Sequence, residues 1–311
     1  MPQRAGQECL ARYHSPMSTA ATHPDSSLVP LRQDAAIIGL VGLAHASSHF
    51  GHLLLPLMFP VFTREFGLSF SELGFLMTVF FVVSGVGQAM SGFLVDRMGA
   101  RPLMFCALGL FGLAALSASL VTGYAGLLLV AVLAGSANAT FHPVDFTILN
   151  HRVSPGRLGH AFSAHGLTGN LGWAAAPVFF AGLSALWGWR QAYVAAAVLY
   201  TGILLWLFLH RDKLSTQVHL ARKPTGDAAP EHAMAFMKLP VVWWCFSFFL
   251  LSTVTLAVVQ NFSVPLLQAM HGVSHQAATL TLTGYMLAGA VGMFVGGFVA
   301  TRTAQIGRAH V

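Results

Sequence analysis

The sequence predicts an all-α, polytopic membrane protein, and three observations lead to this fold class. Of the 311 residues, 55% are apolar and only 8% are charged, whereas roughly a quarter of the residues of a soluble domain are charged. Eight apolar segments are each long enough to cross about 30 Å of hydrocarbon as a helix. The basic residues are concentrated in alternate loops between these segments. A mean hydropathy of +0.67 agrees with this assignment.

The eight predicted spans form a group of six and a group of two, separated by a polar segment. They cover approximately residues 36–61, 74–94, 102–121, 124–148, 162–185, 190–209, 242–267 and 277–300. We therefore expect a tail over 1–34, a six-helix bundle over 35–210, a linker over 211–241 and two helices of a second bundle over 242–305. The last six residues, 306–311, read like the translation of a common sequencing adapter and are set aside as an artefact.

The placement of the basic residues predicts the orientation in the membrane. If the N-terminal tail is cytoplasmic, only Arg64 and Arg190 lie in loops on the opposite side. Because an excess of Lys and Arg marks cytoplasmic loops, the tail and the linker are both expected in the cytoplasm. The tail, the even-numbered loops and the segment after the eighth span hold the remaining basic residues: Arg4, Arg12, Arg32, Arg97, Arg101, Arg152, Arg157, Arg211, Lys213, Arg222, Lys223, Lys238, Arg302 and Arg308.

An internal repeat relates the two groups of spans. A shift of 205 residues brings the seventh and eighth spans over the first and second, which is the signature of a duplicated helical unit. The second unit contains two helices where the first contains six, so we expect four further helices beyond this sequence. The coincident pairs are Pro60 with Pro265, Val86 with Val291, Gly87 with Gly292, Gly92 with Gly297, Phe93 with Phe298, and Arg97 with Arg302.

The loop between the second and third spans carries the motif GFLVDRMGARP. It resembles the signature G-x-L-x-D-R-x-G-R-R of the major facilitator superfamily (MFS), with Ala100 in place of one basic residue. The resemblance implies the MFS fold, as a six-helix N-terminal bundle plus the first two helices of the C-terminal bundle. It also implies that the aspartate contacts the other half of the protein and stabilises one access state. The matching residues are Gly92, Leu94, Asp96, Arg97, Gly99 and Arg101.

A second stretch, residues 135–177, resembles the fosmidomycin resistance group of bacterial transporters within this superfamily. The resemblance implies a multi-pass protein of the bacterial inner membrane that exports a small compound. Two departures weaken the match: His49 stands where the group tends to have an acidic residue, and an exporter motif of the fifth span survives only in part. The matching residues are Phe141, His142, Pro143, Gly156, Arg157, Gly169, Asn170, Gly172 and Pro177.

Three histidines in the first span are candidates for the site. His45, His49 and His52 are spaced i, i+4 and i+7, which places them on one helical face. Imidazole can gain and lose a proton near neutral pH, and it can bind an anion or a metal ion. The alternative is that each ring merely hydrogen-bonds to a neighbouring helix.

Four more polar residues lie at membrane depth: Asn138, His142, Asp145 and Asn170. Asp145 is the only acidic residue inside a predicted span, and such a residue is a functional candidate by default, although a carboxylate wetted at the helix end is the alternative. Pro143 follows His142 and should loosen the helix four residues before it. We therefore expect a hinge close to His142.

These observations predict a secondary transporter that works by alternating access and exports a small organic compound coupled to protons. Neither an HExxH nor a GxSxG motif occurs, so an enzyme is not expected. Cys9, Cys106 and Cys245 are far apart and indicate no zinc site. We expect a monomer in the lipid bilayer, with a small-molecule substrate and protons as partners, no nucleic acid and no cofactor.

Two alternatives remain open at this stage. One is uptake of an organic anion. The other is a membrane sensor that does not transport, with a metal or ligand site at the histidines. A tight metal site would need further ligands, and only geometry can decide whether His142 or Asp145 lies near the first-span histidines.

Overall fold

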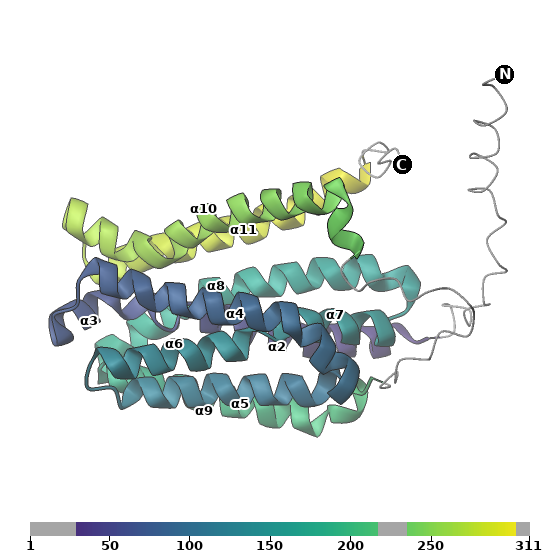
Figure 1. Cartoon of the computed structure of the whole chain (residues 1–311), viewed down its shortest axis with the longest axis horizontal. Coiled ribbons are helices and arrows are strands. Elements are labelled where there is room, and N and C mark those ends of the chain that lie inside the picture. The colour runs from purple at the N-terminus through teal and green to yellow at the C-terminus, as the bar shows by residue number, and fades with distance from the viewer. Residues whose placement is uncertain (1–28, 217–234, 303–311) are drawn as a thin grey trace, which may run out of the picture.

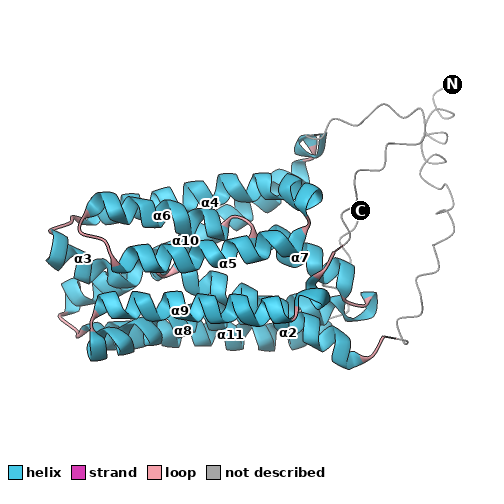
Figure 2. Cartoon of the chain, turned by 90° about the horizontal axis from the view of Figure 1, so that it is seen from below, coloured by secondary structure: helices cyan, strands magenta, loops and turns pink. Residues whose placement is uncertain are grey.

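The computed structural model describes residues 29–216 and 235–302, and every regular element within them is helical (Figure 2). The first part of the chain forms a bundle of long, roughly parallel rods (Figure 1). Its helices are α2 (Leu31–His52), α3 (Phe59–Phe66), α4 (Phe70–Met98), α5 (Ala100–Ser119), α6 (Tyr124–Asn138), α7 (Phe141–Arg152), α8 (Leu158–Trp187) and α9 (Trp189–Leu209), with single turns of 3-10 helix η2 (Pro56–Met58), η3 (Pro155–Arg157) and η4 (Arg211–Leu214).

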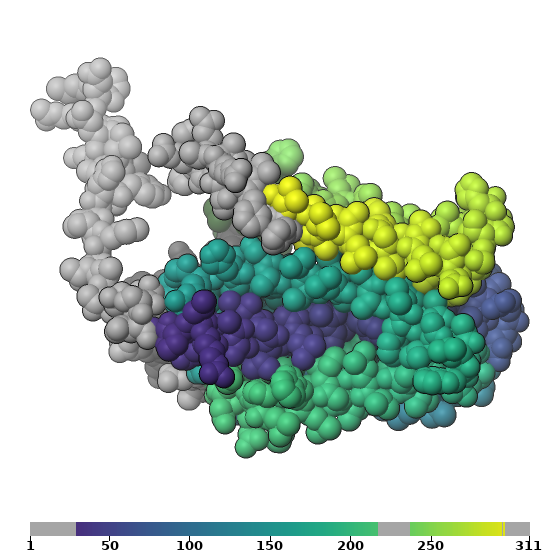
Figure 3. Space-filling view, turned by 180° about the vertical axis from the view of Figure 1, so that it is seen from behind, coloured from purple at the N-terminus to yellow at the C-terminus, as the bar shows by residue number. Residues whose placement is uncertain are grey.

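After the linker, the turn η5 (Ala235–Lys238) leads to two further helices, α10 (Pro240–His271) and α11 (His275–Arg302). They run side by side along one face of the bundle (Figures 1 and 3), with α11 packed against α8. Much of α10 is apolar and exposed, including Trp244, Phe248 and Leu251. A helix that is apolar on all sides needs an apolar environment, which a bilayer provides.

Each of the eight predicted spans corresponds to helical structure. Seven segments within the described residues are long and apolar enough to cross a membrane, from Leu31–Phe66 to Pro240–His271. The eighth predicted span lies within α11, a helix of 28 residues. The expected all-α membrane fold is therefore confirmed.

Two spans that we expected to be continuous are interrupted, and proline explains both interruptions. The first breaks after His52, four residues before Pro56, and the fourth breaks at Ala139, four residues before Pro143. Proline lacks the N–H that would bond to the carbonyl four residues earlier, and its ring clashes with that carbonyl. The expected loosening before Pro143 is thus a true helix break between α6 and α7.

Helix α4 covers the second break. The Ser91 hydroxyl lies 2.7 Å from the Gly87 carbonyl oxygen of its own helix and 3.0 Å from that of Ala139, the acceptor that Pro143 leaves without a helical donor. A Cβ atom added at Gly87 would lie 2.7 Å from that of Ala139. Small residues on α4 therefore allow the close approach that satisfies the exposed backbone.

The basic residues of the predicted cytoplasmic loops meet at one end of the bundle. Arg101 donates to the Arg211 carbonyl at 3.3 Å, and Arg152 donates to the Asp212 carbonyl at 3.5 Å. Arg190 lies elsewhere and pairs with Glu65 at 3.1 Å. The sorting of charge seen in the sequence is therefore present in the fold, and the side of the membrane that each end faces stays a prediction.

The first helix begins earlier than expected. Helix α2 starts at Leu31, so that Asp34, which we had placed in the tail, lies in its first turn and is fully buried. Its carboxylate accepts from the Arg157 guanidinium at 2.8 Å and from the hydroxyl of Ser154. Asp145 is therefore not the only buried acidic residue, and this second carboxylate joins the start of α2 to the loop before α8.

Candidate functional site

The three histidines of α2 form a row inside the bundle. The ring centroids of His45 and His49 are 4.3 Å apart, and those of His49 and His52 are 5.1 Å apart. His45 and His49 keep only 2% and 8% of their surface exposed. The row therefore lies on the inner face of α2, as the i, i+4, i+7 spacing predicts.

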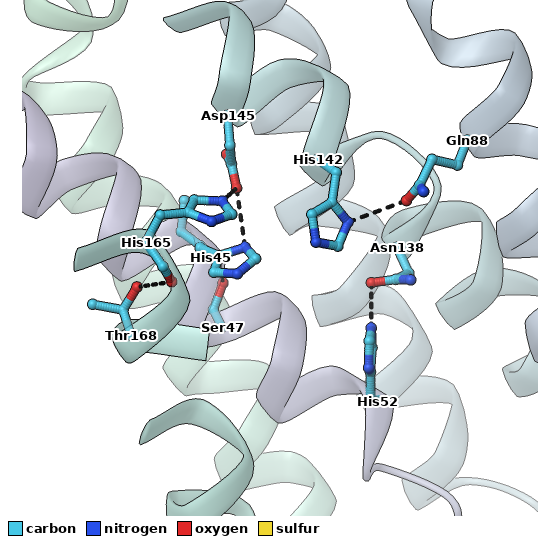
Figure 4. Close-up of polar contacts among 10 residues, drawn as sticks. His45, Ser47, His52, Gln88, Asn138, His142, Asp145, His165 and Thr168 are labelled. Atoms are coloured by element: carbon cyan, nitrogen blue, oxygen red, sulfur yellow. Dashed lines mark hydrogen bonds and ion pairs between the residues drawn. The ribbon is translucent and has the colours of Figure 1, made fainter. Parts of the chain in front are cut away.

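Asp145 of α7 lies at one end of this row and is fully buried (Figure 4). Its Oδ2 atom accepts from Nε2 of His165 at 3.2 Å, and it lies 3.2 Å from Nδ1 of His45. The second contact has the length of an ion pair without the alignment of a hydrogen bond. Within the described residues, the other carboxylate oxygen, Oδ1, has no hydrogen-bond partner.

His165 of α8 completes this group, and our sequence reasoning did not select it. Its ring stacks on that of His45, with centroids 3.4 Å apart and an interplanar angle of 23°. The rule that singled out Asp145, an ionisable side chain within an apolar span, applies equally to His165. The signal was present in the sequence but was not used.

Glycines on α8 make room for the histidine row. A Cβ atom at Gly169 would lie 2.6 Å from the His49 ring and 2.9 Å from Nε2 of His45. At Gly172 it would lie 2.0 Å from the backbone oxygen of Ala46. Both distances are too short for any real side chain, so these glycines allow α8 to approach α2 directly.

His52 is held in a hydrogen-bonded chain across the bundle. The indole N–H of Trp173 donates to its Nδ1 at 3.3 Å, its Nε2 lies 2.7 Å from Oδ1 of Asn138, and the Asn138 amide donates to Ser84 at 2.7 Å. Because indole can only donate, this arrangement requires a neutral His52 that accepts at Nδ1 and donates from Nε2. His52 therefore fits the alternative in which a histidine of the first span hydrogen-bonds to neighbouring helices.

His49 and His142 lie in different surroundings. In the described part of the chain, neither ring nitrogen of His49 has a hydrogen-bond partner, and the ring packs on Trp173 at a centroid distance of 4.1 Å. His142 of α7 contacts Gln88 through Nδ1 at 3.2 Å, and its ring centroid lies 5.3 Å from that of His45. The geometry thus places both His142 and Asp145 beside the first-span histidines.

Asn170 is the predicted site residue that lies apart from this cluster. Its amide nitrogen lies 3.2 Å from the carbonyl oxygen of Gly166 and 3.6 Å from Sδ of Met293 on α11. It therefore faces the contact between the bundle and α11 rather than the histidines.

The conformational motif lies at the end of the bundle where the basic loops meet. Gly99 adopts φ +82°, a value that favours glycine and forms the turn between α4 and α5. Asp96 and Arg97 are exposed, as is Gly92, and Arg101 is the motif residue that binds η4. Among the described residues, no ion pair involves Asp96, so the contact that the resemblance implied is not present within them.

The helical rods and the buried polar cluster define a multi-pass membrane protein with ionisable groups inside its first bundle. The particular family follows from comparison with known proteins: the chain belongs to the Major Facilitator Superfamily, whose family model matches residues 41–310. Members of this superfamily are transporters and not enzymes, in agreement with the prediction.

Two curated relatives and one solved structure show how far the similarity extends. The fosmidomycin resistance protein of Escherichia coli (strain K12) is 25% identical over 92% of this chain and 69% of its own length. The probable L-galactonate transporter of the same strain is 27% identical over 48% of this chain and 33% of its length. A bacterial homolog of the human lysosomal transporter Spinster, in an inward-facing and unoccupied conformation, superimposes with a TM-score of 0.72 at 17% identity, covering 89% of this chain and 64% of that one.

Proposed function

We propose that the protein is a secondary transporter that works by alternating access and exports a small organic compound in exchange for protons. The observation that carries this proposal is the position of the buried cluster, which adjoins the contact between the six-helix bundle and the α10–α11 pair. Transporters of this architecture bind their cargo between two helical units that move relative to each other.

Helix α8 links the cluster to that contact. His165 and Gly169 face α2 and α7, whereas Ala174 accepts from Thr283 of α11 at 3.4 Å and Asn170 contacts Met293. A movement of α11 along α8 would therefore act on the helix that carries one side of the cluster.

The predicted pathway residues divide into two groups. His45, His49 and Asp145 are proposed to face the transported species, because each has a buried polar atom with no hydrogen-bond partner among the described residues; His142 is included because its ring lies 5.3 Å from that of His45. His52 and Asn138 are proposed to hold α2, α4 and α6 together. Asn170 is proposed to respond to α11, and Asp96 with its neighbours in the motif to stabilise one access state through a helix outside the described residues.

Export, proton coupling and cytoplasmic placement of the N-terminus extend the resemblance to the fosmidomycin resistance group. Uptake of an organic anion is the second candidate, and the similarity to a probable L-galactonate transporter favours an organic anion as the cargo. The cluster favours a cargo that is not a strong anion, in whichever direction it moves, since no Lys or Arg of the described residues pairs with Asp145 or the histidines.

Proton flux in inverted membrane vesicles tests the proposal. The complete gene that carries this sequence is expressed in a host that lacks its own exporters, the vesicle lumen is acidified by respiration, and candidate compounds are added outside. We expect a compound to release protons from the lumen, and Asp145→Asn or His49→Ala to abolish the release. His160→Ala, an exposed histidine on α8, should leave it intact.

Two results would overturn the proposal in different ways. Proton movement that appears only when the compound is loaded inside the vesicles would indicate uptake. Compound movement that proceeds with no change in proton flux would exclude protons as the coupling ion.

A further inference from the structure

Three helices bring nitrogen and oxygen ligand atoms to one point inside the bundle. His45 of α2, Asp145 of α7 and His165 of α8 each offer one atom, and these atoms all lie within 4.8 Å of one another. We propose that the protein binds one divalent metal ion, such as Zn²⁺ or Co²⁺, at these three residues. The site shares His45 and Asp145 with the residues that the proposed function assigns to the transported species, but its test measures metal binding and not flux, so the two proposals can fail separately.

The spacing of the ligand atoms matches the requirement of such an ion. Zinc is bound tetrahedrally at about 2.0–2.1 Å by imidazole nitrogen and carboxylate oxygen, so that two ligand atoms lie about 3.3 Å apart. Oδ2 of Asp145 lies 3.2 Å from Nδ1 of His45 and 3.2 Å from Nε2 of His165. Two edges of the tetrahedron therefore already have the right length.

Unsatisfied polar atoms at the same place provide a second, independent observation. Oδ1 of Asp145, Nδ1 of His45 and both ring nitrogens of His49 are buried with no hydrogen-bond partner in the described part of the chain. Buried polar atoms are nearly always paired, and each one left unpaired costs about 1–3 kcal/mol. A cation held by Oδ2 of Asp145 would give Nδ1 of His45 a partner and would place positive charge beside the carboxylate whose Oδ1 is unpaired.

The charge of the site points in the same direction. Asp145 is fully buried, and its ion-pair partners among the described residues are imidazoles alone. An ionised carboxylate at membrane depth needs a partner of opposite charge, which here is either an imidazolium or a bound cation. Imidazole ligands suit zinc, copper, iron and nickel, whereas magnesium and calcium prefer oxygen ligands alone, so two histidines beside one carboxylate favour a transition metal.

Two further histidines lie near this site. His45, His49 and His142 form a second group that meets the same 4.8 Å limit and shares His45 with the first. Neither His49 nor His142 meets this limit together with all three ligands of the first group, so the fourth position is left to a water molecule, as in zinc sites with three protein ligands. The stacked rings of His45 and His165 must rotate so that both lone pairs converge, and a neutral His165 must then carry its proton on Nδ1.

Cobalt binding to the purified full chain tests the proposal directly. The protein is prepared in detergent with a tag that contains no histidine, stripped with a chelator and titrated with Co²⁺, whose visible spectrum reports tetrahedral coordination. We expect one saturable ion per chain with tetrahedral absorption, and displacement of that ion by Zn²⁺. Asp145→Asn and His165→Phe should each weaken binding by at least about 100-fold, because loss of a supporting residue alone costs about 10–100-fold.

Matched variants separate this site from the other thirteen of the fifteen histidines in the chain. His160→Ala and His271→Ala remove exposed rings and should leave the affinity unchanged. His165→Cys retains a zinc ligand and should restore binding with a thiolate-to-cobalt charge-transfer band, which shows that the variant is folded and that position 165 touches the metal. The proposal is overturned by folded protein without saturable binding, by equal affinity in wild type, Asp145→Asn and His165→Phe, or by His165→Cys without the new band.

Discussion

His45 and His165, on helices α2 and α8, stack with ring centroids 3.4 Å apart and share one carboxylate oxygen of Asp145. Three helices are thus joined at one buried point by polar and ionisable groups. Burying any one of these groups without a partner would cost free energy. The arrangement depends on α8 lying directly against α2, which glycine on α8 permits.

Gly169→Ala should destabilise the protein by about 1–3 kcal/mol, the usual cost of an added methyl group in a packed interior. The new Cβ atom would meet the rings of His49 and His45 at under 3 Å. Unfolding in mixed detergent micelles, followed by tryptophan fluorescence, measures the change.

Gly182→Ala is the matched control, because it lies on the same helix with no atom within 4 Å of the added Cβ. In a helix, alanine is favoured over glycine by up to about 1 kcal/mol, so this control should be neutral or stabilising. Equal effects of the two substitutions would show that the contact at Gly169 is not tight.

The break between α6 and α7 gives a second prediction. Ser91→Ala removes a hydroxyl shared between the carbonyls of Gly87 at 2.7 Å and Ala139 at 3.0 Å and should cost about 1 kcal/mol. In a Pro143→Ala background, the new N–H of residue 143 can bond to the Ala139 carbonyl, so the same substitution should cost less and lose only the bond to Gly87. A double-mutant cycle on the free energy of unfolding measures this difference.

Strict additivity in that cycle would contradict the explanation of the break. Ser163→Ala serves as the control, since its hydroxyl bonds within its own exposed turn of α8 and should be insensitive to residue 143.

Much of the fold follows from sequence patterns that act locally. Hydropathy located all eight spans, and the proline rule located the break before His142, because both depend on residues close together in the chain. The same rule applied to Pro56 would have ended the first helix at His52. The early start of α2 was not predicted, because an acidic residue such as Asp34 is expected in a polar tail. Its ion-pair partner, Arg157, lies far along the chain, and no local pattern indicates the contact.

The site was less predictable, because it depends on which helix faces meet. The spacing of His45, His49 and His52 predicted a common face, but not that His52 would be hydrogen-bonded on both sides while His49 would have no hydrogen-bond partner among the described residues. The approach of Asp145 to His45 depends on the packing of α7 against α2, which no pattern within either helix encodes.

The hydrogen-bonded chain at His52 leads to a third prediction. Asn138→Leu leaves both His52 and Ser84 without their partner, and should cost about 1–3 kcal/mol for each buried polar group left unpaired. Equilibrium unfolding in mixed micelles is the measurement. Asn150→Leu, at an exposed position of α7, should change stability by less than about 0.5 kcal/mol, and a similar loss in both variants would exclude a special role for Asn138.

The ion pair between Asp34 and Arg157 gives the last prediction. Asp34 is fully buried, whereas Arg157 keeps 28% of its side chain exposed, so that Asp34→Ala should cost about 3 kcal/mol, the lower end of the range for a buried pair that loses one partner. The Glu65–Arg190 pair is the matched control, because both partners are 39–45% exposed, and Glu65→Ala should cost less than about 1 kcal/mol.

Raising the salt concentration should weaken the control pair and leave the Asp34 pair nearly unchanged, since solvent ions screen exposed charges far more than covered ones. If both pairs lost stability equally with salt, Asp34 would be solvated and could not fasten α2 to the loop before α8.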